Sequence, residues 1–349
     1  MSTSKTLHQL GWQAFFQQQL NLEEFEQAII ARVIAHHRSE YRVLSPQGEF
    51  TLPRLTSMPD LVLGDWLLLS VEGQFQRLLE RKSLFARKAA GAKVERQLIA
   101  SNVDSVFIVS SLNQDFNLSR IERYLALAYE AQVEPIVVLT KADLCQHSEQ
   151  LAEQVRVLDP LLCVEVVNGL SSQCQTQLMP WCGAGKTVSM LGSSGVGKST
   201  LVNALLGENV QLTSGIREDD SKGRHTTTSR SMHFMTNGAV LIDTPGMREL
   251  QLADCEQGVK RAFADIDALA AECKFQDCRH GAEPGCAVLA AIESGELDSR
   301  RLVNYRKLLA EQAYNQSSFV EQRQKAKQFG KMVKSVSRQT RYIKNSYER

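Results

Sequence analysis

The feature that most constrains this chain is an eight-residue signature in its second half. Residues 192–199 read GSSGVGKS and fit the phosphate-binding pattern GxxxxGK[ST]. An apolar strand is expected just before them, at residues 188–191, and a helix from Ser199 to Leu206 just after them, with Gly207 as its C-cap. Because both flanks suit the pattern, it predicts a nucleotide-binding P-loop rather than a chance turn rich in Gly and Ser.

The residue types of this loop suit the binding of a triphosphate. Glycines let the backbone wrap around phosphates with its N–H groups pointing inward. We expect Lys198 to neutralise the β- and γ-phosphates as the catalytic cation, and the Ser199 hydroxyl to bind Mg²⁺. The residues expected to contact GTP here are Gly192, Ser193, Ser194, Gly195, Val196, Gly197, Lys198, Ser199 and Thr200.

A second motif addresses the base. Thr140-Lys141-Ala142-Asp143 ends a predicted strand at residues 135–139 and resembles the [NT]KxD guanine motif. The Asp143 carboxylate can accept hydrogen bonds from guanine N1–H and from its exocyclic amine. Adenine has no such donor pair and would leave a buried carboxylate unpaired, which is costly. Lys141 would lie along the base. The alternative is a turn at the end of a strand, with Lys141 in solvent.

A third motif is expected near the γ-phosphate. Asp243-Thr244-Pro245-Gly246 resembles DxxG, in which Asp243 would hold Mg²⁺ through water and the Gly246 N–H would contact the γ-phosphate. The alternative is a Pro-Gly turn after a strand. Residues 223–228 read GRHTTT, and Thr227 or Thr228 would complete the Mg²⁺ shell, with nothing in the sequence to choose between them.

The order of these motifs along the chain is unusual. Strands expected at residues 103–112, 135–139, 162–167, 188–191 and 239–242 alternate with helices, which predicts a mostly parallel, doubly wound sheet over residues 86–250. One helix is expected to begin with a capping box at residues 119–122 (SRIE). In most GTPases the guanine motif follows DxxG, whereas here it precedes the P-loop. We therefore predict an α/β P-loop GTPase in circularly permuted order, with every loop still at the carboxyl edge of the sheet.

The region before the GTPase has a different pattern. Residues 28–85 carry five short strand signals, which predicts a small β-barrel, and the OB-fold is the commonest such barrel that binds nucleic acid. Tyr41, Phe50, Trp66 and Phe75 would either stack RNA bases or fill the barrel core, and the core is the favoured interpretation. Residues 1–27 form an N-terminal extension to which we assign no chemistry.

The region after the GTPase, residues 251–349, is expected to be mostly helical and to bind metal. Cys273, Cys278, His280 and Cys286 offer three thiolates and one imidazole within a short loop, which predicts one structural zinc ion with no open position. The alternative is three reduced cysteines beside a surface histidine. Residues 323–349 are strongly basic, and would bind a phosphate backbone or form a solvated tail.

Bulk properties exclude several other classes. The formal net charge is +1, so overall charge does not point to nucleic acid, and no apolar run is long enough to predict a membrane span. Eight cysteines in 349 residues do not resemble a secreted disulfide scaffold, and no signal or transit peptide is apparent. We expect a soluble cytoplasmic protein, with a monomer as the simplest assembly.

Together with Gly64-Asp65-Trp66 and the GRHTTT segment, these motifs resemble the ribosome small-subunit-dependent GTPase family of circularly permuted GTPases, over almost the whole chain. The resemblance implies an OB domain, a permuted GTPase and a zinc domain. It also implies binding to the 30S ribosomal subunit and its 16S rRNA late in maturation, with hydrolysis of GTP to GDP and phosphate stimulated by the subunit. The chain departs from the family in having Thr140 where Asn is usual, and VNG at residues 167–169 in place of a loop that contains serine.

The residue after DxxG bears on the rate of hydrolysis. Many GTPases place there a Gln that orients the attacking water, whereas this chain has Met247, which predicts slow intrinsic turnover. His225 is our candidate for orienting the water once the ribosome orders its loop, with a structural or RNA-contacting role as the alternative. Other classes that remain open are a guanine-nucleotide-dependent RNA-binding module with little hydrolysis, an ATP-using kinase and a zinc-finger DNA-binding protein.

Overall fold

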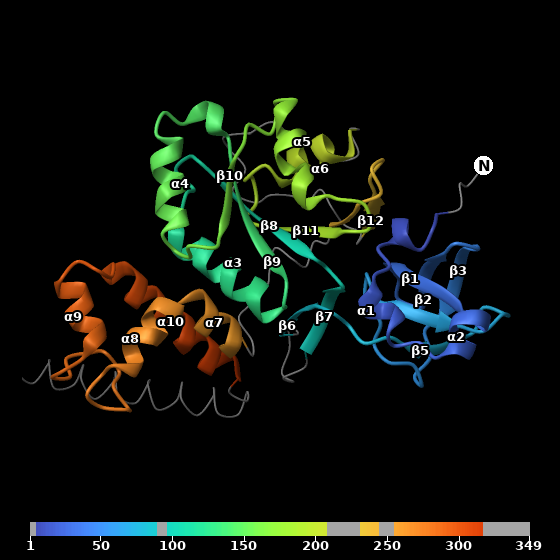
Figure 1. Ribbon diagram of the computed structural model, residues 1–349, viewed down its shortest axis with the longest axis horizontal. Coiled ribbons are helices and arrows are strands. Elements are labelled where there is room, and N and C mark those ends of the chain that lie inside the picture. Colours follow the sequence, from blue (N-terminus) through green and yellow to red (C-terminus); the bar gives the residue numbers. More distant parts are fainter. Residues whose placement is uncertain (1–4, 89–95, 208–230, 244–254, 317–349) are drawn as a thin grey trace, which may run out of the picture.

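The computed structural model describes residues 5–88, 96–207, 231–243 and 255–316. They form an N-terminal antiparallel sheet, a central α/β sheet and a group of C-terminal helices (Figure 1). The N-terminal sheet and the C-terminal helices lie on opposite sides of the central sheet. The three predicted kinds of architecture are therefore present in the predicted chain order.

The N-terminal sheet contains the five strands expected from the sequence. Their order in space is β3-β2-β1-β4-β5, and each neighbouring pair is antiparallel. Apolar side chains gather on its concave face, so the predicted barrel is a curled sheet with its own core. Among the described residues no hydrogen-bonded ladder joins the edge strands. The strands are β1 (Ile29–His36), β2 (Glu40–Ser45), β3 (Gly48–Pro53), β4 (Trp66–Leu69) and β5 (Phe75–Leu78).

The aromatic residues of this sheet serve mainly as core. Tyr41 lies in the concave core with 1% of its surface exposed, and Trp66 is fully buried on the opposite face. Phe50 and Phe75 are half-buried and pack against the same core as Tyr41. The interpretation of these four side chains as packing residues is therefore the better one, and buried Tyr41 and Trp66 present no ring for a base to stack on.

The N-terminal extension covers the outer face of the sheet. Trp12 packs edge-on against Trp66 with ring centroids 4.8 Å apart, and Phe16 joins them. A capping box begins its last helix, because Asn21 and Glu24 each accept a hydrogen bond from the other's backbone N–H. Its short helices are η1 (His8–Leu10), α1 (Ala14–Gln17) and α2 (Leu22–Gln27).

The Gly64-Asp65-Trp66 motif has a physical basis at the junction of this sheet with the rest of the chain. Gly64 has a φ of +97°, and a Cβ there would lie 2.1 Å from the carbonyl oxygen of Ser101, so only glycine fits. The buried Asp65 carboxylate accepts hydrogen bonds from Arg81 at 2.7 Å and from the Ser101 hydroxyl at 2.6 Å. The motif therefore holds β4 against the strand that leads into the central sheet.

That strand belongs to a hairpin of β6 (Leu84–Lys88) and β7 (Arg96–Ser101), which was not predicted. The hairpin spans the predicted boundary between residues 85 and 86. A buried arginine, Arg32, bridges the same junction by donating hydrogen bonds to the carbonyl oxygens of Gly64 and Asn102 at 3.3 and 3.1 Å. Burial lowers the pKa of Arg32 to about 10, so it stays charged at neutral pH.

The central sheet has the strand order β10-β9-β8-β11-β13-β12. All neighbouring pairs are parallel except β12 with β13. The five predicted strands are confirmed, whereas the short edge strand β12 was missed. Their bounds are β8 (Ser105–Ser111), β9 (Glu134–Thr140), β10 (Cys163–Val166), β11 (Thr187–Leu191), β12 (Ser231–Phe234) and β13 (Val240–Asp243).

Helices connect the parallel strands, and the first of them differs from expectation at its start. Asn117 is its N-cap and accepts from the Arg120 N–H, so the capping box predicted at residues 119–122 is wrong. Its Glu122 is fully buried and has distant partners. The helices and 3-10 turns are α3 (Leu118–Glu130), η2 (Ala142–Leu144), α4 (Ser148–Arg156), α5 (Gln173–Leu178), η3 (Met179–Trp181) and α6 (Lys198–Leu206).

The C-terminal helices share a core with the α3 side of the central sheet. A Cβ on Gly258 of α7 would lie 2.0 Å from the Ala126 carbonyl oxygen, so glycine lets α7 approach α3 closely. The described part of the chain holds no helix with the length and apolarity to cross a membrane. The basic segment 323–349 lies outside the described residues. The helices are α7 (Glu256–Ala262), α8 (Ala264–Ala271), α9 (Ala287–Glu293) and α10 (Ser299–Gln316).

Candidate nucleotide and metal sites

The P-loop lies between β11 and α6, as the sequence predicts. Gly192 has a φ of +148°, and a Cβ there would lie 2.4 Å from the Val109 carbonyl oxygen of β8. Gly197 is the N-cap of α6 with a φ of +97°. Gly207 ends α6 in the left-handed conformation, which confirms it as the C-cap. Glycine is therefore required at both ends of the loop by close approach and by backbone conformation.

Lys198 is held inside this loop. Only 8% of it is exposed, and its ammonium donates hydrogen bonds to the carbonyl oxygens of Gly192, at 2.6 Å, and Ser193. A buried charge needs such partners. The side chain is thus fixed with its charge at the loop before any anion arrives, which is the pre-organisation that phosphate binding requires.

The guanine motif lies beside the P-loop. The buried Thr140 hydroxyl donates a 2.6 Å hydrogen bond to the carbonyl oxygen of Val196, joining two loops that are 56 residues apart. Lys141 follows in the left-handed conformation with a φ of +59°, and Asp143 lies on η2 with its side chain exposed. The exposed carboxylate is therefore available to a ligand at this edge, as the guanine interpretation requires.

The DxxG aspartate reaches the same edge of the sheet. Asp243 is the last residue of β13, which runs parallel to β11, and the Ser189 hydroxyl donates to the Ile242 carbonyl oxygen at 2.9 Å. Because parallel strands end at one edge, Asp243, the P-loop and the guanine motif converge there. Five residues of interest lie outside the described residues: His225, Thr227, Thr228, Gly246 and Met247.

One cation at the P-loop was not predicted. The Arg120 guanidinium, on the first turn of α3, donates a 2.8 Å hydrogen bond to the Ser193 hydroxyl and contacts both oxygens of Asp115. The sequence analysis placed Arg120 in a capping box and gave it no role in binding. The available signal was its position on the first turn of the helix that follows β8, because helices that follow the strands of a parallel sheet begin at the ligand-binding edge.

The predicted metal ligands converge. One ligand atom from each of Cys273, Cys278, His280 and Cys286 lies within 4.8 Å of every other. The two sulfurs of Cys273 and Cys286 are 3.8 Å apart, and they lie 3.6 and 3.4 Å from His280 Nδ1. A tetrahedral zinc ion with ordinary bond lengths would separate two sulfurs by about 3.8 Å and sulfur from nitrogen by about 3.5 Å. The donor set therefore fits zinc in both chemistry and size.

The backbone around the cluster supports its geometry. His280 has a φ of +57°, an uncommon conformation that turns its ring toward the sulfurs. The Cys286 sulfur accepts from the Leu289 N–H at 3.5 Å, and the Glu283 carboxylate accepts from the N–H groups of Gly281 and Ala282 at 2.6 and 3.0 Å. Burial lowers the pKa of His280, which favours the neutral imidazole that a metal ligand needs.

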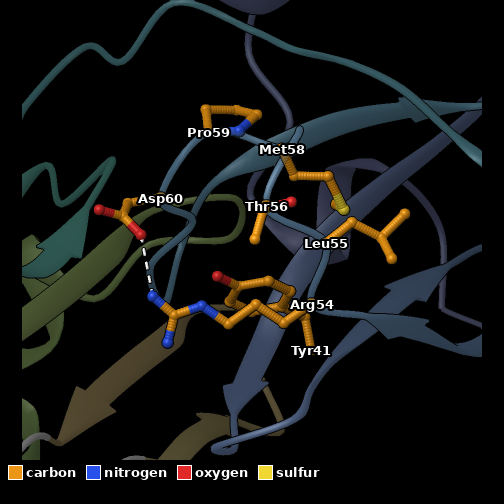
Figure 2. A pocket seen from close by; sticks show the side chains of 7 residues that line it. All are labelled: Tyr41, Arg54, Leu55, Thr56, Met58, Pro59 and Asp60. Carbon is orange, nitrogen blue, oxygen red and sulfur yellow. Dashed lines mark hydrogen bonds and ion pairs between the residues drawn. The ribbon is translucent and has the colours of Figure 1, made fainter.

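A separate pocket of about 290 Å³ lies on the N-terminal sheet (Figure 2). An ion pair of 3.0 Å between Arg54 and Asp60 crosses it, and nothing in the sequence analysis pointed to it. Its lining comes from β2 and from the segment that follows β3, and contains none of the motif residues. The lining residues are Tyr41, Arg54, Leu55, Thr56, Met58, Pro59 and Asp60.

Comparisons with known proteins agree with this arrangement. Residues 78–253 match the family model of the RsgA GTPase. The chain is 60% identical to the small ribosomal subunit biogenesis GTPase RsgA 2 of Vibrio parahaemolyticus, over 99% of this chain and 97% of the relative. It is 46% identical to the small ribosomal subunit biogenesis GTPase RsgA of Mesorhizobium japonicum, over 90% and 92% of the two chains.

Solved structures support the fold. YjeQ from Thermotoga maritima superposes with a TM-score of 0.59 at 24% identity, covering 81% of this chain and 98% of the other. YloQ, described as a circularly permuted GTPase, gives a TM-score of 0.57 at 22% identity, covering 84% and 97%. At these identities the likeness concerns the fold alone.

Proposed function

This chain belongs to the RsgA GTPase family, and on that premise we propose that it hydrolyses GTP to GDP and phosphate while assisting the biogenesis of the small ribosomal subunit. The observation that carries the proposal is the contact of Thr140 with Val196, because it joins the guanine motif to a loop in which Lys198 is already oriented. An ATP-using enzyme would have no use for Asp143 at this position.

The proposed nucleotide site divides into three parts. Thr140, Lys141 and Asp143 read the base. Residues 192–200 hold the phosphates, with Lys198 as the cation beside the β- and γ-phosphates. Ser199 and Asp243, with Thr227 or Thr228, would hold Mg²⁺, which would neutralise negative charge on the phosphates when bound. Gly246 is proposed to contact the γ-phosphate and His225 to orient the attacking water.

We further propose that Cys273, Cys278, His280 and Cys286 bind one zinc ion. The separations of the ligand atoms support this assignment. Four protein ligands leave no position for substrate, so the ion would stabilise the segment between α8 and α9 and take no part in hydrolysis. An Fe–S cluster is disfavoured because one of the four ligands is an imidazole.

The proposed partner is the 30S subunit with its 16S rRNA, and the relatives' role in biogenesis of the small ribosomal subunit supports the first of these. We infer a cytoplasmic monomer that binds the subunit late in its assembly. Tyr41 and Trp66 are buried and therefore cannot stack on RNA bases. RNA would instead contact exposed polar and basic side chains of the N-terminal sheet. We also propose that residues 1–27, 28–85, 86–250 and 251–349 form the functional divisions of the chain, with the hairpin of β6 and β7 joining the second to the third.

The proposal is tested by measuring steady-state GTP hydrolysis with and without purified 30S subunits. We expect slow turnover by the protein alone, strong stimulation by 30S subunits and no effect of 50S subunits, with Lys198→Ala inactive in every condition. Hydrolysis that 30S subunits leave unchanged would contradict the ribosome-linked role. It would favour a guanine-nucleotide-dependent RNA-binding module with little hydrolysis.

A further inference from the structure

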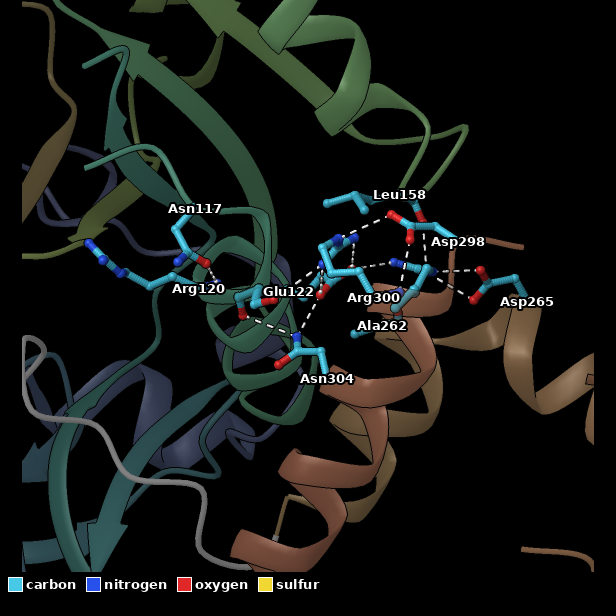
Figure 3. Close-up of polar contacts among 11 residues, drawn as sticks. Asn117, Arg120, Glu122, Leu158, Ala262, Asp265, Asp298, Arg300 and Asn304 are labelled. Atoms are coloured by element: carbon cyan, nitrogen blue, oxygen red, sulfur yellow. Dashed lines mark hydrogen bonds and ion pairs between the residues drawn. The ribbon is translucent and has the colours of Figure 1, made fainter. Parts of the chain in front are cut away.

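Arg120 lies at the P-loop although it belongs to none of the nucleotide-binding motifs. It is on the first turn of α3, which follows β8 at the ligand-binding edge of the sheet. Its Nη1 donates to the Ser193 hydroxyl at 2.8 Å. Figure 3 shows the Arg120 side chain pointing away from the cluster around Glu122, so the two residues serve opposite sides of the helix.

Ser193 therefore contacts two cations. Its carbonyl oxygen accepts from the Lys198 ammonium and its hydroxyl accepts from the Arg120 guanidinium. Lys198 is the cation proposed for the β- and γ-phosphates, so Arg120 adds a second positive charge that contacts the same P-loop residue. Two positive charges at one residue repel each other, and an anion between or beside them offsets that repulsion.

In this structure Asp115 provides that anion. Arg120 Nη1 lies 2.8 and 2.7 Å from its two carboxylate oxygens, and the side chains are 34% and 38% exposed. A pair this exposed contributes little stability, so exchanging the carboxylate for another anion costs little. A guanidinium can donate two parallel hydrogen bonds to the oxygens of one phosphate. Its charge does not depend on pH in the physiological range.

We propose that Arg120 is a second phosphate cation of this site, which exchanges Asp115 for the γ-phosphate of GTP and so makes the protein prefer GTP over GDP. The inference rests on the proposed function and adds to it a residue from outside the P-loop, guanine and DxxG motifs. The same contact would stabilise the charge that develops on the γ-phosphate during hydrolysis, as an arginine supplied within the chain does in other GTPases.

The test is nucleotide affinity, measured by fluorescence titration with labelled GDP and a labelled non-hydrolysable GTP analogue. Arg120→Met is expected to weaken binding of the GTP analogue about tenfold and of GDP by less than about twofold, because the bond lost is charge-assisted and involves the γ-phosphate alone. Arg123→Met is the matched control. Arg123 lies on the same helix and forms an ion pair of 2.6 Å with Glu311, with 25% of its side chain exposed, and its loss should leave both affinities unchanged.

Two further variants sharpen the result. Arg120→Lys should keep part of the preference for GTP over GDP, because lysine keeps the positive charge but cannot donate the second parallel hydrogen bond. Asp115→Asn should increase the preference for the GTP analogue, because the competing carboxylate is gone, and it provides the test if Arg120→Met does not fold. An equal loss for both nucleotides in Arg120→Met, or an unchanged ratio in Asp115→Asn, would overturn the inference and leave Arg120 as a brace for the P-loop. An unaltered protein that binds neither nucleotide would instead overturn the proposed function.

Discussion

The Glu122 carboxylate of α3 and the Arg301 guanidinium of α10 form an ion pair of 2.9 Å, with 0% and 6% of the two side chains exposed. Arg300 and Asn304 also donate to Glu122, and Asp265 of α8 pairs with Arg301 at 2.6 Å (Figure 3). Every charge in this group has a hydrogen-bonded partner. The network therefore joins the central helix to the C-terminal helices through a satisfied buried contact.

Replacing one member of this pair should be costly. Glu122→Ala is expected to lower the free energy of unfolding by about 3 kcal/mol, because it removes one of the two carboxylates that pair with the buried Arg301 guanidinium and leaves Asp265 as the other. Glu311→Ala removes the α10 partner of Arg123, another residue of α3, and should cost less, about 1 kcal/mol, because both side chains of that pair are about a quarter exposed. The two variants are compared by the midpoints of their unfolding in urea. Similar midpoints would show that the buried pair stabilises the protein no more than the Arg123–Glu311 pair does.

The threonine at the head of the guanine motif should limit affinity for the base. Its hydroxyl has one proton and donates it to Val196, whereas an asparagine amide has two protons and can also donate to guanine N7. Thr140→Asn is therefore expected to tighten GDP and GTP binding by about 1 kcal/mol, or roughly fivefold. Thr140→Val should weaken both, because the Val196 carbonyl loses its donor. The affinities of both variants for GDP and GTP are measured by titration calorimetry. Tighter nucleotide binding by Thr140→Val would contradict the role given to the Thr140 hydroxyl.

Metal analysis should find one zinc per chain. Cys286→Ser, or treatment with a strong chelator, is expected to remove it and to unfold the segment between α8 and α9, because structural zinc supplies about 10–16 kcal/mol in small zinc-dependent units. Since Cys286 also belongs to the core shared with α3, thermal unfolding should begin at a lower temperature. Cys163→Ser, at an exposed cysteine of β10, is the control. Retention of zinc by Cys286→Ser would show that the ion has other ligands.

The N-terminal extension should be less stably folded at low pH. A hydrogen bond from Arg77 of β5 lowers the pKa of Glu24 to about 2. A carboxyl whose pKa is lowered by folding stabilises the folded protein at pH values above its ordinary pKa of 4.5, and this contribution is lost as the pH falls through about 2. Unfolding followed between those pH values should be less pH-dependent in Glu24→Gln than in the unaltered protein. Glu23→Gln serves as the control, and equal slopes in the two variants would contradict the assignment.

The sequence alone was informative where the functional residues lie close together along the chain and form a recognisable pattern. The P-loop, its strand and its helix cap follow from glycine positions and apolar runs, and the clustering of Cys273, Cys278, His280 and Cys286 follows from their spacing. Glu122 was misjudged because its position after Asn117 and Ser119 imitates a capping box, while its true partners lie almost 180 residues further on. Arg120 was overlooked for the same reason. Local spacing carries no information on which face of α3 meets the P-loop and which meets α10.

The permuted order of the strands also fixes when the nucleotide site can form during synthesis. Asp243 is made about 100 residues after Asp143, a delay of about 5–20 s at ordinary elongation rates. Until β11 emerges, β8 has only β9 beside it, and one of its edges stays open to unwanted pairing. The nascent chain therefore contains the guanine motif well before it contains the P-loop. GTP thus cannot assist the folding of the first part of the sheet while that part is being made.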